Sequence, residues 1–322
     1  MRVRLDARQK CDVAVITVNF NSSSHTIACV ESIQAFTNTR LDVKIVVIDN
    51  NSSDDDFEQL KSLRNDPRVM LHRSPQNIGF ASANMLALQF VLPEYVFFLN
   101  NDCTLKNDAA SILVSFMQKH AACSMCCGLL TDEHGYPVKS WDYFPDVLPK
   151  IFGKALYRLT RLGHYRNPKV APCGPQKVEV ISGSQMFIRM SVFSDIGGFD
   201  TNFFLYCEEE DLAARIARRK EEVWIVPEAR VRHIGGASTR RSLEIRREFL
   251  ISLLYFYRKN YGFLASLSIR IIYFLRYAKK AFHDSEAIWL SIFLLIGPQL
   301  HHSMRHSQKI SSINHLDNDS TP

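Results

Sequence analysis

Two apolar runs near the start of the chain constrain the fold most. Val13–Val18 and Val43–Ile48 are apolar at nearly every position and rich in β-branched residues, a pattern typical of strands buried on both faces. Helical segments are predicted between and after them, and two more strands follow, with approximate ranges His25–Phe36, Asp55–Arg64 and Asn77–Val91 for the helices and Val69–Arg73 and Tyr95–Leu99 for the strands. This alternation predicts an α/β fold with a mostly parallel sheet and helices on both of its faces.

Polar residues gather at the ends of the predicted strands. The four clusters are Thr17–Asn21, Asp49–Ser53, Arg73–Asn77 and Asn100–Asp102. Ligands of such sheets bind beyond the carboxyl ends of the strands, so the clusters predict one binding site. Asp49 could accept a hydrogen bond from a nucleobase or a ribose there, but the turn chemistry of its neighbours explains it equally well.

Asp102 is harder to explain by turn propensity, because it follows the apolar run Val96–Leu99 after only two asparagines. A carboxylate at that position is a suitable ligand for Mg²⁺ or Mn²⁺ bound to a diphosphate. His233 precedes a Gly-Gly turn and could complete the coordination shell. An ordinary surface or core histidine is an equally good interpretation of the sequence.

Four consecutive carboxylates, Glu208–Asp211, open a predicted helix. Acidic residues complement the dipole at a helix start, so a solvated helix terminus is the simpler interpretation. Four of them exceed that need, and their mutual repulsion should raise the pKa of at least one. We therefore favour a general base in this cluster. The segment Val178–Arg189 is predicted to form a strand pair beside it.

Composition and cysteine usage indicate a globular intracellular protein. The chain has 322 residues, of which 46% are hydrophobic, so it can bury a large core without disulfides. Its N-terminus has no apolar segment typical of a secretory signal, and the eight cysteines show no disulfide-scaffold spacing, so we expect reduced thiols and a cytoplasmic location. Cys123, Cys126 and Cys127 resemble half of a zinc site, but buried strand cysteines are the better interpretation.

Charge is distributed unevenly along the chain. Residues 1–211 contain 21 Lys and Arg against 24 Asp and Glu, whereas residues 212–309 contain 18 against 7, a balance of +11. A basic region of this kind could meet nucleic acid, an anionic membrane surface or a phosphorylated substrate. Because no nucleic-acid-binding signature accompanies it, we predict no nucleic-acid partner.

The sequence of the C-terminal third predicts helices. Phe249–Tyr261 predicts a helix that ends at Gly262, while Phe263–Phe282 and Ile288–Ile296 are apolar but fall short of the roughly 20 uninterrupted residues of a membrane span. These helices either pack on the preceding domain or lie peripherally on the cytoplasmic face of the inner membrane. The predicted regions are an N-terminal extension (1–12), a catalytic domain (13–245), a helical region (246–304) and a disordered tail (305–322).

Six motifs in order resemble family 2 glycosyltransferases, the inverting, nucleotide-sugar-dependent kind, and most of all their bacterial rhamnosyltransferase branch. The motifs are Val15–Asn21, Val46–Asp54, Asn77–Asn84, Phe98–Asp102, Gly197–Asp200 with the acidic helix, and His233–Ser238. This resemblance implies the GT-A nucleotide-diphospho-sugar transferase fold and a Mg²⁺ or Mn²⁺ cofactor. It also implies a nucleotide-sugar donor, with dTDP-L-rhamnose favoured, and as acceptor a hydroxyl of a cell-surface polysaccharide or lipid-linked glycan.

The resemblance also assigns roles to individual residues. Asp102 and His233 would hold the metal, and Glu209 would be the catalytic base, with Asp211 as the alternative because a glutamate stands where the family has its aspartate. Asn100 replaces the first acid of the Asp-x-Asp motif. The predicted donor-binding residues are Thr17, Asn19, Asp49, Asn51, Asn77, Gly79 and Asn101, and the predicted acceptor-binding residues are Gly183, Ser184 and Glu208.

Three alternatives to a glycosyltransferase are a glycosidase, a nucleotidylyltransferase and a scaffold protein. A glycosidase needs two carboxylates flanking the scissile bond, whereas direct transfer needs one base. A nucleotidylyltransferase would need a glycine-rich basic loop after the first strand, but Asn19–Ser24 is neither. A catalytically degenerate sugar-binding or scaffold protein stays open, because the chain departs from the family pattern at two positions.

Overall fold

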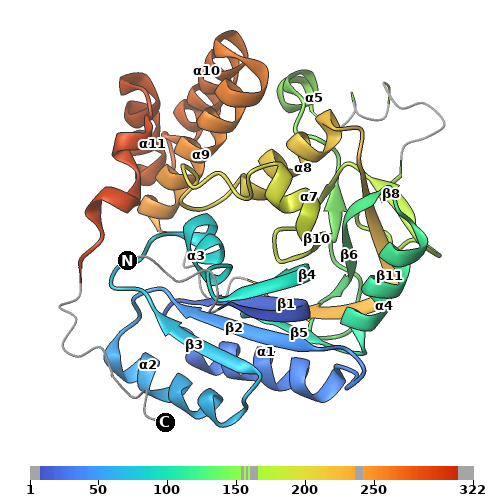
Figure 1. Cartoon of the computed structure of the whole chain (residues 1–322). Helices are drawn as coiled ribbons and strands as arrows, with labels where there is room; N and C mark the ends of the chain where they lie inside the picture. Colours follow the sequence, from blue (N-terminus) through green and yellow to red (C-terminus); the bar gives the residue numbers. More distant parts are fainter. Residues whose placement is uncertain (1–7, 154–155, 157–158, 160–165, 236–241, 311–322) are drawn as a thin grey trace.

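A mixed nine-stranded sheet forms the centre of the computed structural model, which describes residues 8–153, 156, 159, 166–235 and 242–310 (Figure 1). The strand order is β3-β2-β1-β4-β10-β6-β11-β5, with β8 also paired to β11. These strands are β1 (Gln9–Asn19), β2 (Val43–Asp49), β3 (Val69–Arg73), β4 (Val91–Leu99), β5 (Cys103–Leu105), β6 (Cys123–Thr131), β8 (Gln176–Val178), β10 (Gln185–Arg189) and β11 (Glu222–His233). A small second sheet pairs β7 (Trp141–Asp142) with β9 (Val180–Ile181).

The first half of the sheet is parallel, as predicted, and the second half is not. Strands β3, β2, β1 and β4 run parallel to one another, and β11 runs parallel to β6. By contrast, β10 is antiparallel to both of its neighbours, and β5 and β8 are antiparallel to β11. The predicted parallel pairing is thus found throughout the N-terminal half of the sheet, whereas the C-terminal half combines one parallel pair with antiparallel pairs.

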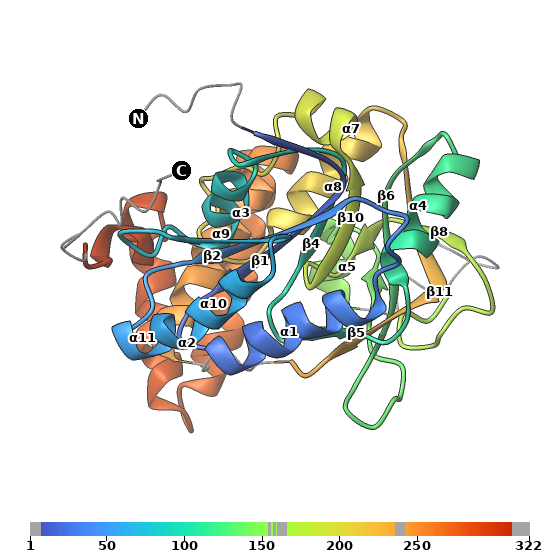
Figure 2. The ribbon, with the colours of Figure 1, turned by 60° about the horizontal axis from the view of Figure 1, so that its bottom comes forward.

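Helices cover both faces of the sheet (Figures 1 and 2). The helices are α1 (Ser23–Phe36), α2 (Asp54–Leu60), α3 (Phe80–Ala87), α4 (Ala109–Lys119), α5 (Val147–Phe152), α7 (Met190–Asp195), α8 (Glu208–Arg218), α9 (Leu243–Tyr261), α10 (Phe263–Lys280) and α11 (Ser285–Ile296). Short 3₁₀ helices span Lys61–Asn65, Leu300–His302 and Met304–Ser307. Helix α3 ends at Ala87, four residues before the predicted end, because Val91 already begins β4.

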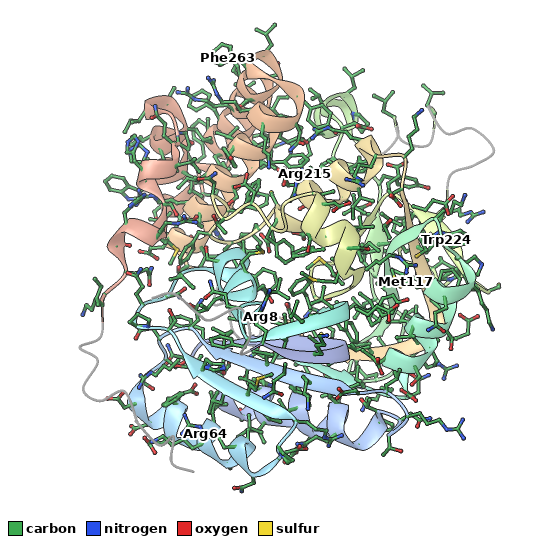
Figure 3. The ribbon with its side chains drawn as sticks, viewed as in Figure 1. Arg8, Arg64, Met117, Arg215, Trp224 and Phe263 are labelled. Carbon is green, nitrogen blue, oxygen red and sulfur yellow. The ribbon has the colours of Figure 1, made fainter. Side chains whose placement is uncertain are left out.

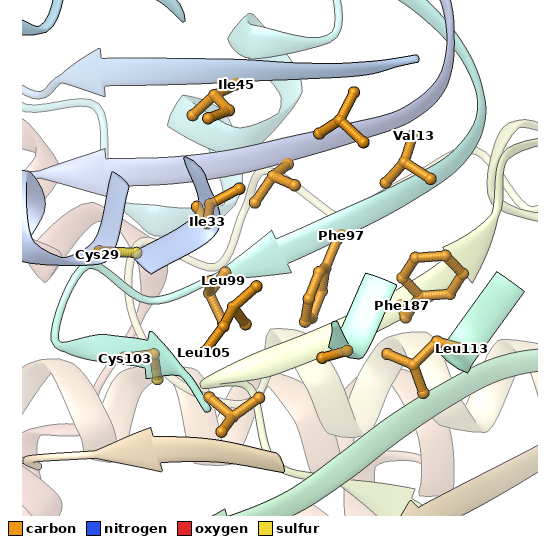
Figure 4. Packing of buried hydrophobic residues seen from close by; sticks show 14 of the residues in the cluster. Val13, Cys29, Ile33, Ile45, Phe97, Leu99, Cys103, Leu105, Leu113 and Phe187 are labelled. Atoms are coloured by element: carbon orange, nitrogen blue, oxygen red, sulfur yellow. The ribbon is translucent and has the colours of Figure 1, made fainter. Parts of the chain in front are cut away.

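Alternate residues of each central strand enter two separate cores. Val13 and Val15 of β1 pack with α1, α2 and α4, whereas Ala14 and Ile16 pack with α3, α7 and α8. Figure 4 shows the first of these cores, where Phe97 and Phe187 approach each other from β4 and β10. Burial on both faces is the physical reason why these strands are apolar at nearly every position. Cys123, Cys126 and Cys127 are buried and free in β6, as predicted.

A third core joins α9, α10 and α11 to the segment before α8. Gly262, with a φ of 90°, separates α9 from α10 at the predicted stop. No helix in the described ranges is long and apolar enough to cross a membrane.

The predicted end regions are only partly separate from the rest. Strand β1 starts at Gln9, inside the predicted N-terminal extension. The buried carboxylate of Glu248 on α9 accepts hydrogen bonds of 2.8 Å from both Ser303 Oγ and the Met304 backbone N–H. Arg305 donates to the carbonyl oxygen of Thr201, so residues 305–310, predicted as disordered, follow an ordered path. The remainder of the predicted tail, 311–322, lies outside the described residues.

Candidate active site

The loops after β1 and β2 are joined through Asn19. Its amide nitrogen donates to Asp49 Oδ1 (3.0 Å), Ser52 Oγ (3.0 Å) and Asp56 Oδ2 (2.7 Å). Its amide oxygen accepts a hydrogen bond of 2.7 Å from Thr26 Oγ1 on α1. Asn19 exposes no surface, so it supports the loops and does not present a group to a ligand in this structure. Asp56 was not predicted, because one acid in the run of three, Asp54–Asp56, has no distinctive spacing.

Asp49 is buried within the same network. Its carboxylate also accepts from the Ser52 backbone N–H (3.3 Å) and is paired with Arg73 Nε (3.2 Å). The pKa of Asp49 is raised overall, because the effect of burial exceeds the opposing effects of the hydrogen bonds from Ser52 and Asn19 and of the charge of Arg73. Because Asp49 has no exposed surface, the predicted direct contact with a donor is not available in this conformation.

Two further predicted donor-binding residues are also internal. Thr17 is fully buried on β1. Asn101 is 4% exposed, and its amide donates to Ser22 Oγ (2.7 Å) and Thr26 Oγ1 (2.9 Å) at the start of α1. Asn101 therefore joins the loop after β4 to the start of α1, and a donor contact of either residue stays a prediction.

Asn51, Asn77 and Gly79 lie along the same edge of the sheet. Asn51 has a φ of 67°, and its amide donates to the Lys309 carbonyl oxygen (3.1 Å). Asn77 Oδ1 accepts from Asn50 Nδ2 (2.9 Å) and from the Gly79 backbone N–H (3.0 Å). These bonds fix the loop that leads into α3.

Gly79 is required by the protein's own backbone. Its φ is 81°, and a Cβ at this position would lie 2.4 Å from the Phe204 carbonyl oxygen. That oxygen accepts a hydrogen bond of 2.8 Å from the backbone N–H of Phe80. The backbone at Gly79 thus closely approaches the segment that enters the acidic helix, which joins the first half of the sheet to α8.

A carboxylate, a thiol and an imidazole lie close together where β5 begins. Antiparallel pairing of β5 with β11 sets Cys103 opposite His233, and Asp102 immediately precedes Cys103. Asp102 Oδ1 lies 3.2 Å from His233 Nε2, and the ligand atoms of all three residues lie within 4.8 Å of one another. Burial, followed by the charge of Asp102, raises the pKa of the Cys103 thiol well above its usual range. The thiol therefore stays protonated, and the carboxylate and imidazole are the groups suited to Mn²⁺ or Mg²⁺.

The turn before α8 is tightly constrained. Tyr206 and Cys207 are consecutive residues in the left-handed region, with φ values of 74° and 67°. Non-glycine residues adopt this conformation only where the surroundings enforce it. Within α8, Arg215 (labelled in Figure 3) donates to the carbonyl oxygens of Ile196 (2.8 Å) and Gly198 (2.6 Å). The helix is thereby held against the predicted Gly197-Gly198 turn.

Asp211 points away from the pocket and into an internal ion pair. Its carboxylate is fully buried and is bound by Arg215 Nε (2.8 Å), Lys259 Nζ (2.7 Å) and Asn260 Nδ2 (3.2 Å). Both oxygens of this carboxylate contact side chains inside the protein, and Asp211 does not line the cavity in front of Glu209. The geometry therefore argues against Asp211 as an alternative base.

Glu209, in the first turn of α8, lies next to the Gly183-Ser184 turn. Its carboxyl carbon would be 3.2 Å from a Cβ at Gly183, so it packs directly over that glycine. The next residue, Ser184, accepts hydrogen bonds from the Asn100 backbone N–H (2.9 Å) and Cys103 Sγ (3.5 Å). The Gly183-Ser184 turn, predicted to bind the acceptor, thus bridges the two acidic sites that are about a hundred residues apart in the sequence.

Two carboxyl groups at the start of α8, those of Glu208 and Glu209, have raised pKa values. Burial first, then the charges of Glu210 and Glu208, raises the pKa of Glu209 well above its usual range. Burial also raises the pKa of Glu208 to about 8. Glu208 is only 6% exposed and does not line the cavity in front of Glu209, so its contact with an acceptor stays a prediction.

A cavity of about 510 Å³ opens in front of Glu209 and Glu210. Aromatic rings of Trp141, Tyr143 and Tyr273 line it together with four cationic side chains, namely Lys139, Lys150, Lys169 and Arg276. Lys139 is paired with Asp142. Aromatic faces beside hydrogen-bonding groups are suited to a sugar ring, and the cations are suited to an anionic group. The sequence did not indicate these residues, because they come from β7, α5, α10 and loops, which long-range packing brings together.

The family model for glycosyl transferase family 2 matches residues 14–197, which is more than half of the chain. The chain belongs to glycosyl transferase family 2. Rhamnosyltransferase WbbL of Escherichia coli (strain K12) is 27% identical over 161 residues, which are 46% of this chain and 58% of that protein. An N-acetylglucosaminyl-diphospho-decaprenol L-rhamnosyltransferase of Mycobacterium tuberculosis (strain CDC 1551 / Oshkosh) is 24% identical over 242 residues, 70% of this chain and 77% of that protein.

A solved structure shows the same fold. The mannosyltransferase PcManGT from Pyrobaculum calidifontis, in complex with GDP-Man and Mn²⁺, aligns with a TM-score of 0.53 at 14% identity. The alignment covers 89% of this chain and 81% of that chain. The fold of this family 2 protein is thus the GT-A type, with added C-terminal helices, and both points confirm the expectation from sequence.

Proposed function

We propose that this family 2 glycosyltransferase transfers a sugar from a nucleotide-diphosphate donor to a glycan hydroxyl with inversion at the anomeric carbon. One observation carries the proposal: the Glu209 carboxylate packs over Gly183 at the floor of a sugar-sized pocket, one turn away from the Asp102–His233 pair. Base and diphosphate-binding group thus lie on either side of the Gly183-Ser184 turn.

In the proposed mechanism, Glu209 accepts the proton of the acceptor hydroxyl as that oxygen attacks the anomeric carbon. Burial and the neighbouring charges raise the pKa of Glu209, so its deprotonated carboxylate is a stronger base toward the acceptor hydroxyl than an ordinary glutamate. The Gly183-Ser184 turn sets the distance between the base and the donor side of the site. One carboxylate suffices for this displacement, whereas a glycosidase would need a second across the bond.

Asp102 and His233 are the residues that would hold Mn²⁺ or Mg²⁺. A cation bound there would offset the negative charge on the departing nucleoside diphosphate. The fit rests on the buried Asp102 oxygen beside the imidazole nitrogen of His233, on a strand end facing the predicted donor side. Asn51 and Asn77 are the predicted donor-binding side chains with exposed surface at that edge.

We further propose dTDP-L-rhamnose as donor and a lipid-linked glycan precursor as acceptor, used at the cytoplasmic face of the inner membrane. The names of the two rhamnosyltransferase relatives support the sugar, and the diphospho-decaprenol in one of them supports the acceptor class. In the pocket, Lys150 and Arg276 are cations close to Glu209 and Glu210 that could bind an anionic linkage.

Release of nucleoside diphosphate from a panel of nucleotide sugars, measured with Mn²⁺ and with excess EDTA, tests the proposal. We expect turnover of one donor, loss of turnover in EDTA, and loss in Asp102→Ala. Asp55→Ala, which removes an exposed carboxylate on α2, is the matched control and should behave as wild type. Full turnover in EDTA would contradict the metal site. Donor binding by thermal shift without turnover on any acceptor would favour the scaffold alternative.

A further inference from the structure

The C-terminal helices present apolar side chains to the outside. On α10, Leu264, Ile271 and Leu275 are spaced by seven and four residues, so they form one stripe along the helix. Phe282 continues the stripe just beyond the helix end. The most exposed members, across both α10 and α11, are Leu264 (75%), Phe282 (85%), Trp289 (63%), Leu295 (62%) and Ile296 (69%).

These stripes lie opposite the core that the helices share. Ile269 of α10 and Leu290 and Leu294 of α11 are buried against α9 in the third core. Ile271 is about 200° around the helix from Ile269, and Ile292 is about 200° from Leu290, at about 100° per residue. Arg270 ties the two helices together by donating to the Leu294 and Leu295 carbonyl oxygens (both 2.6 Å). The apolar stripes of α10 and α11 are called here the outer helical face. Within the part of the chain that the structure describes, they lie outside the three hydrophobic cores.

Basic residues accompany the outer helical face. Residues 263–296, which include α10 and α11, contain four Lys and Arg against two Asp and Glu. Arg276, Lys279 and Lys280 are exposed on α10. Both acids, Asp284 and Glu286, lie beside Arg246 (3.7 and 3.1 Å), so their charge is compensated locally. The face thus combines exposed aromatic and aliphatic side chains with excess positive charge, which is the composition of an interfacial membrane-binding surface.

Helix α10 also forms part of the acceptor pocket. Tyr273 and Arg276 line the cavity in front of Glu209, while Ile271 and Leu275 of the same helix belong to the outer helical face. Arg276 also donates to the Lys150 carbonyl oxygen (2.9 Å), which ties α10 to α5 at the pocket wall. Figure 3 shows Phe263, the first residue of α10, at the outer extreme of these helices.

We infer that the outer helical face docks on an anionic lipid bilayer, with α10 and α11 lying in the headgroup region and the acceptor pocket opening beside it. Charge complementarity selects an anionic bilayer over an uncharged apolar partner. That docking delivers the acceptor to the pocket rests on the proposed function. Binding of the outer helical face to the bilayer does not depend on that function. A lipid-linked acceptor would then reach Glu209 without leaving the membrane.

Vesicle co-sedimentation of the full chain tests this inference. We expect binding to phosphatidylglycerol-containing vesicles, weaker binding to neutral phosphatidylcholine vesicles, and further weakening as salt rises. The double variant Leu264→Ser/Trp289→Ser should bind at least about tenfold more weakly, since each side chain loses its apolar burial in the bilayer. Phe36→Ser, which changes an exposed aromatic at the end of α1, is the matched control and should bind as wild type.

The basic component is tested separately. Lys279→Gln/Lys280→Gln should weaken binding to anionic vesicles about 25-fold, from about fivefold for each lysine, and leave binding to neutral vesicles unaffected. Failure of the wild-type chain to pellet with anionic vesicles would overturn the inference. So would a soluble dimer that the Leu264→Ser/Trp289→Ser change dissociates, because a second copy would then cover the face.

Turnover of a water-soluble acceptor without vesicles separates this inference from the proposed function. If turnover is present and vesicle binding is absent, only the docking inference fails. If vesicle binding is present and no donor is turned over, the proposed function fails and the docking inference stands.

Discussion

At the start of α8, neighbouring carboxylates lie in different surroundings. Glu208 is buried with a raised pKa, Glu209 and Glu210 face the pocket, and Asp211 is neutralised by two cations inside the protein. Successive residues of an α-helix are rotated by about 100° around its axis, so four consecutive side chains must point in different directions. The cluster was predictable from the sequence as unusual, but the division of roles follows from which neighbours each residue meets.

Replacing Asp211 tests its structural role. Asp211→Asn should lower the free energy of unfolding by about 2 kcal/mol, because Arg215 and Lys259 lose their shared anion in a largely buried site. Asp195→Asn is the control, since its exposed ion pair with Arg219 should contribute less than about 1 kcal/mol. Urea unfolding of both variants gives the comparison. An unchanged stability of Asp211→Asn together with complete loss of chemistry would instead mark it as the base.

The pH dependence of turnover tests the coupling between Glu209 and Glu210. A base with a raised pKa is protonated at low pH, so turnover should rise with pH as Glu209 loses its proton. Glu210→Gln removes the neighbouring charge that helps to raise the pKa of Glu209, so the rising limb should move to lower pH. Glu228→Gln, an exposed change on β11, should leave the profile in place. A limb that stays fixed in Glu210→Gln would mean that another group controls it.

At the scale of elements, local pattern predicted the strands and helices better than their pairing. The apolar runs of β1 and β2 and the cap-rich turns between them are local signals, and the structure confirms those elements. The antiparallel insertion of β10 between β4 and β6 depends on contacts across about 90 residues, which no local pattern encodes.

The difference between local patterns and long-range contacts also explains which site residues could be predicted from the sequence. Asp102 and His233 were predictable as candidates, because each follows or ends a strand in an unusual way, and β5–β11 pairing brings them together. Asp49 and Asn19 were predicted as ligand-binding because strand-end polarity looks alike whether it faces a ligand or another loop. The pocket cations Lys150 and Arg276 carry no sequence signal, since each is one basic residue in a helix.

Gly79 offers a test of how the elements are joined. Gly79→Ala should cost about 1–2 kcal/mol for its positive φ and a further 1–3 kcal/mol for overlap with the Phe204 backbone. Gly135→Ala is the matched control, because its φ is 83° with no atom within 4 Å of a Cβ, so only the first cost applies. Thermal or urea unfolding measures the difference. Equal losses in the two variants would show that the segment before α8 moves aside easily.

At the scale of the whole molecule, three cores assemble one site. The first two cores fix the donor side at the strand ends, and the third sets α9 and α10 against α8 and the pocket. Helix α8 is common to both parts: Arg215 holds it to the Gly197-Gly198 turn, and Asp211 pairs it with Lys259 of α9. Glu209 therefore stands where the two halves meet, and the proposed chemistry depends on its position.

Single-turnover transfer by Glu209→Gln, with donor and Mn²⁺ bound, tests the central proposal most directly. The amide keeps the shape of the side chain but cannot accept the acceptor's proton, so transfer should fall at least about a hundredfold. Donor affinity, measured in the same samples, should be unchanged because Glu209 acts on the acceptor. Glu228→Gln serves as the matched control and should transfer as wild type. A wild-type transfer rate in Glu209→Gln would contradict the account, and the base would have to be sought elsewhere in the pocket.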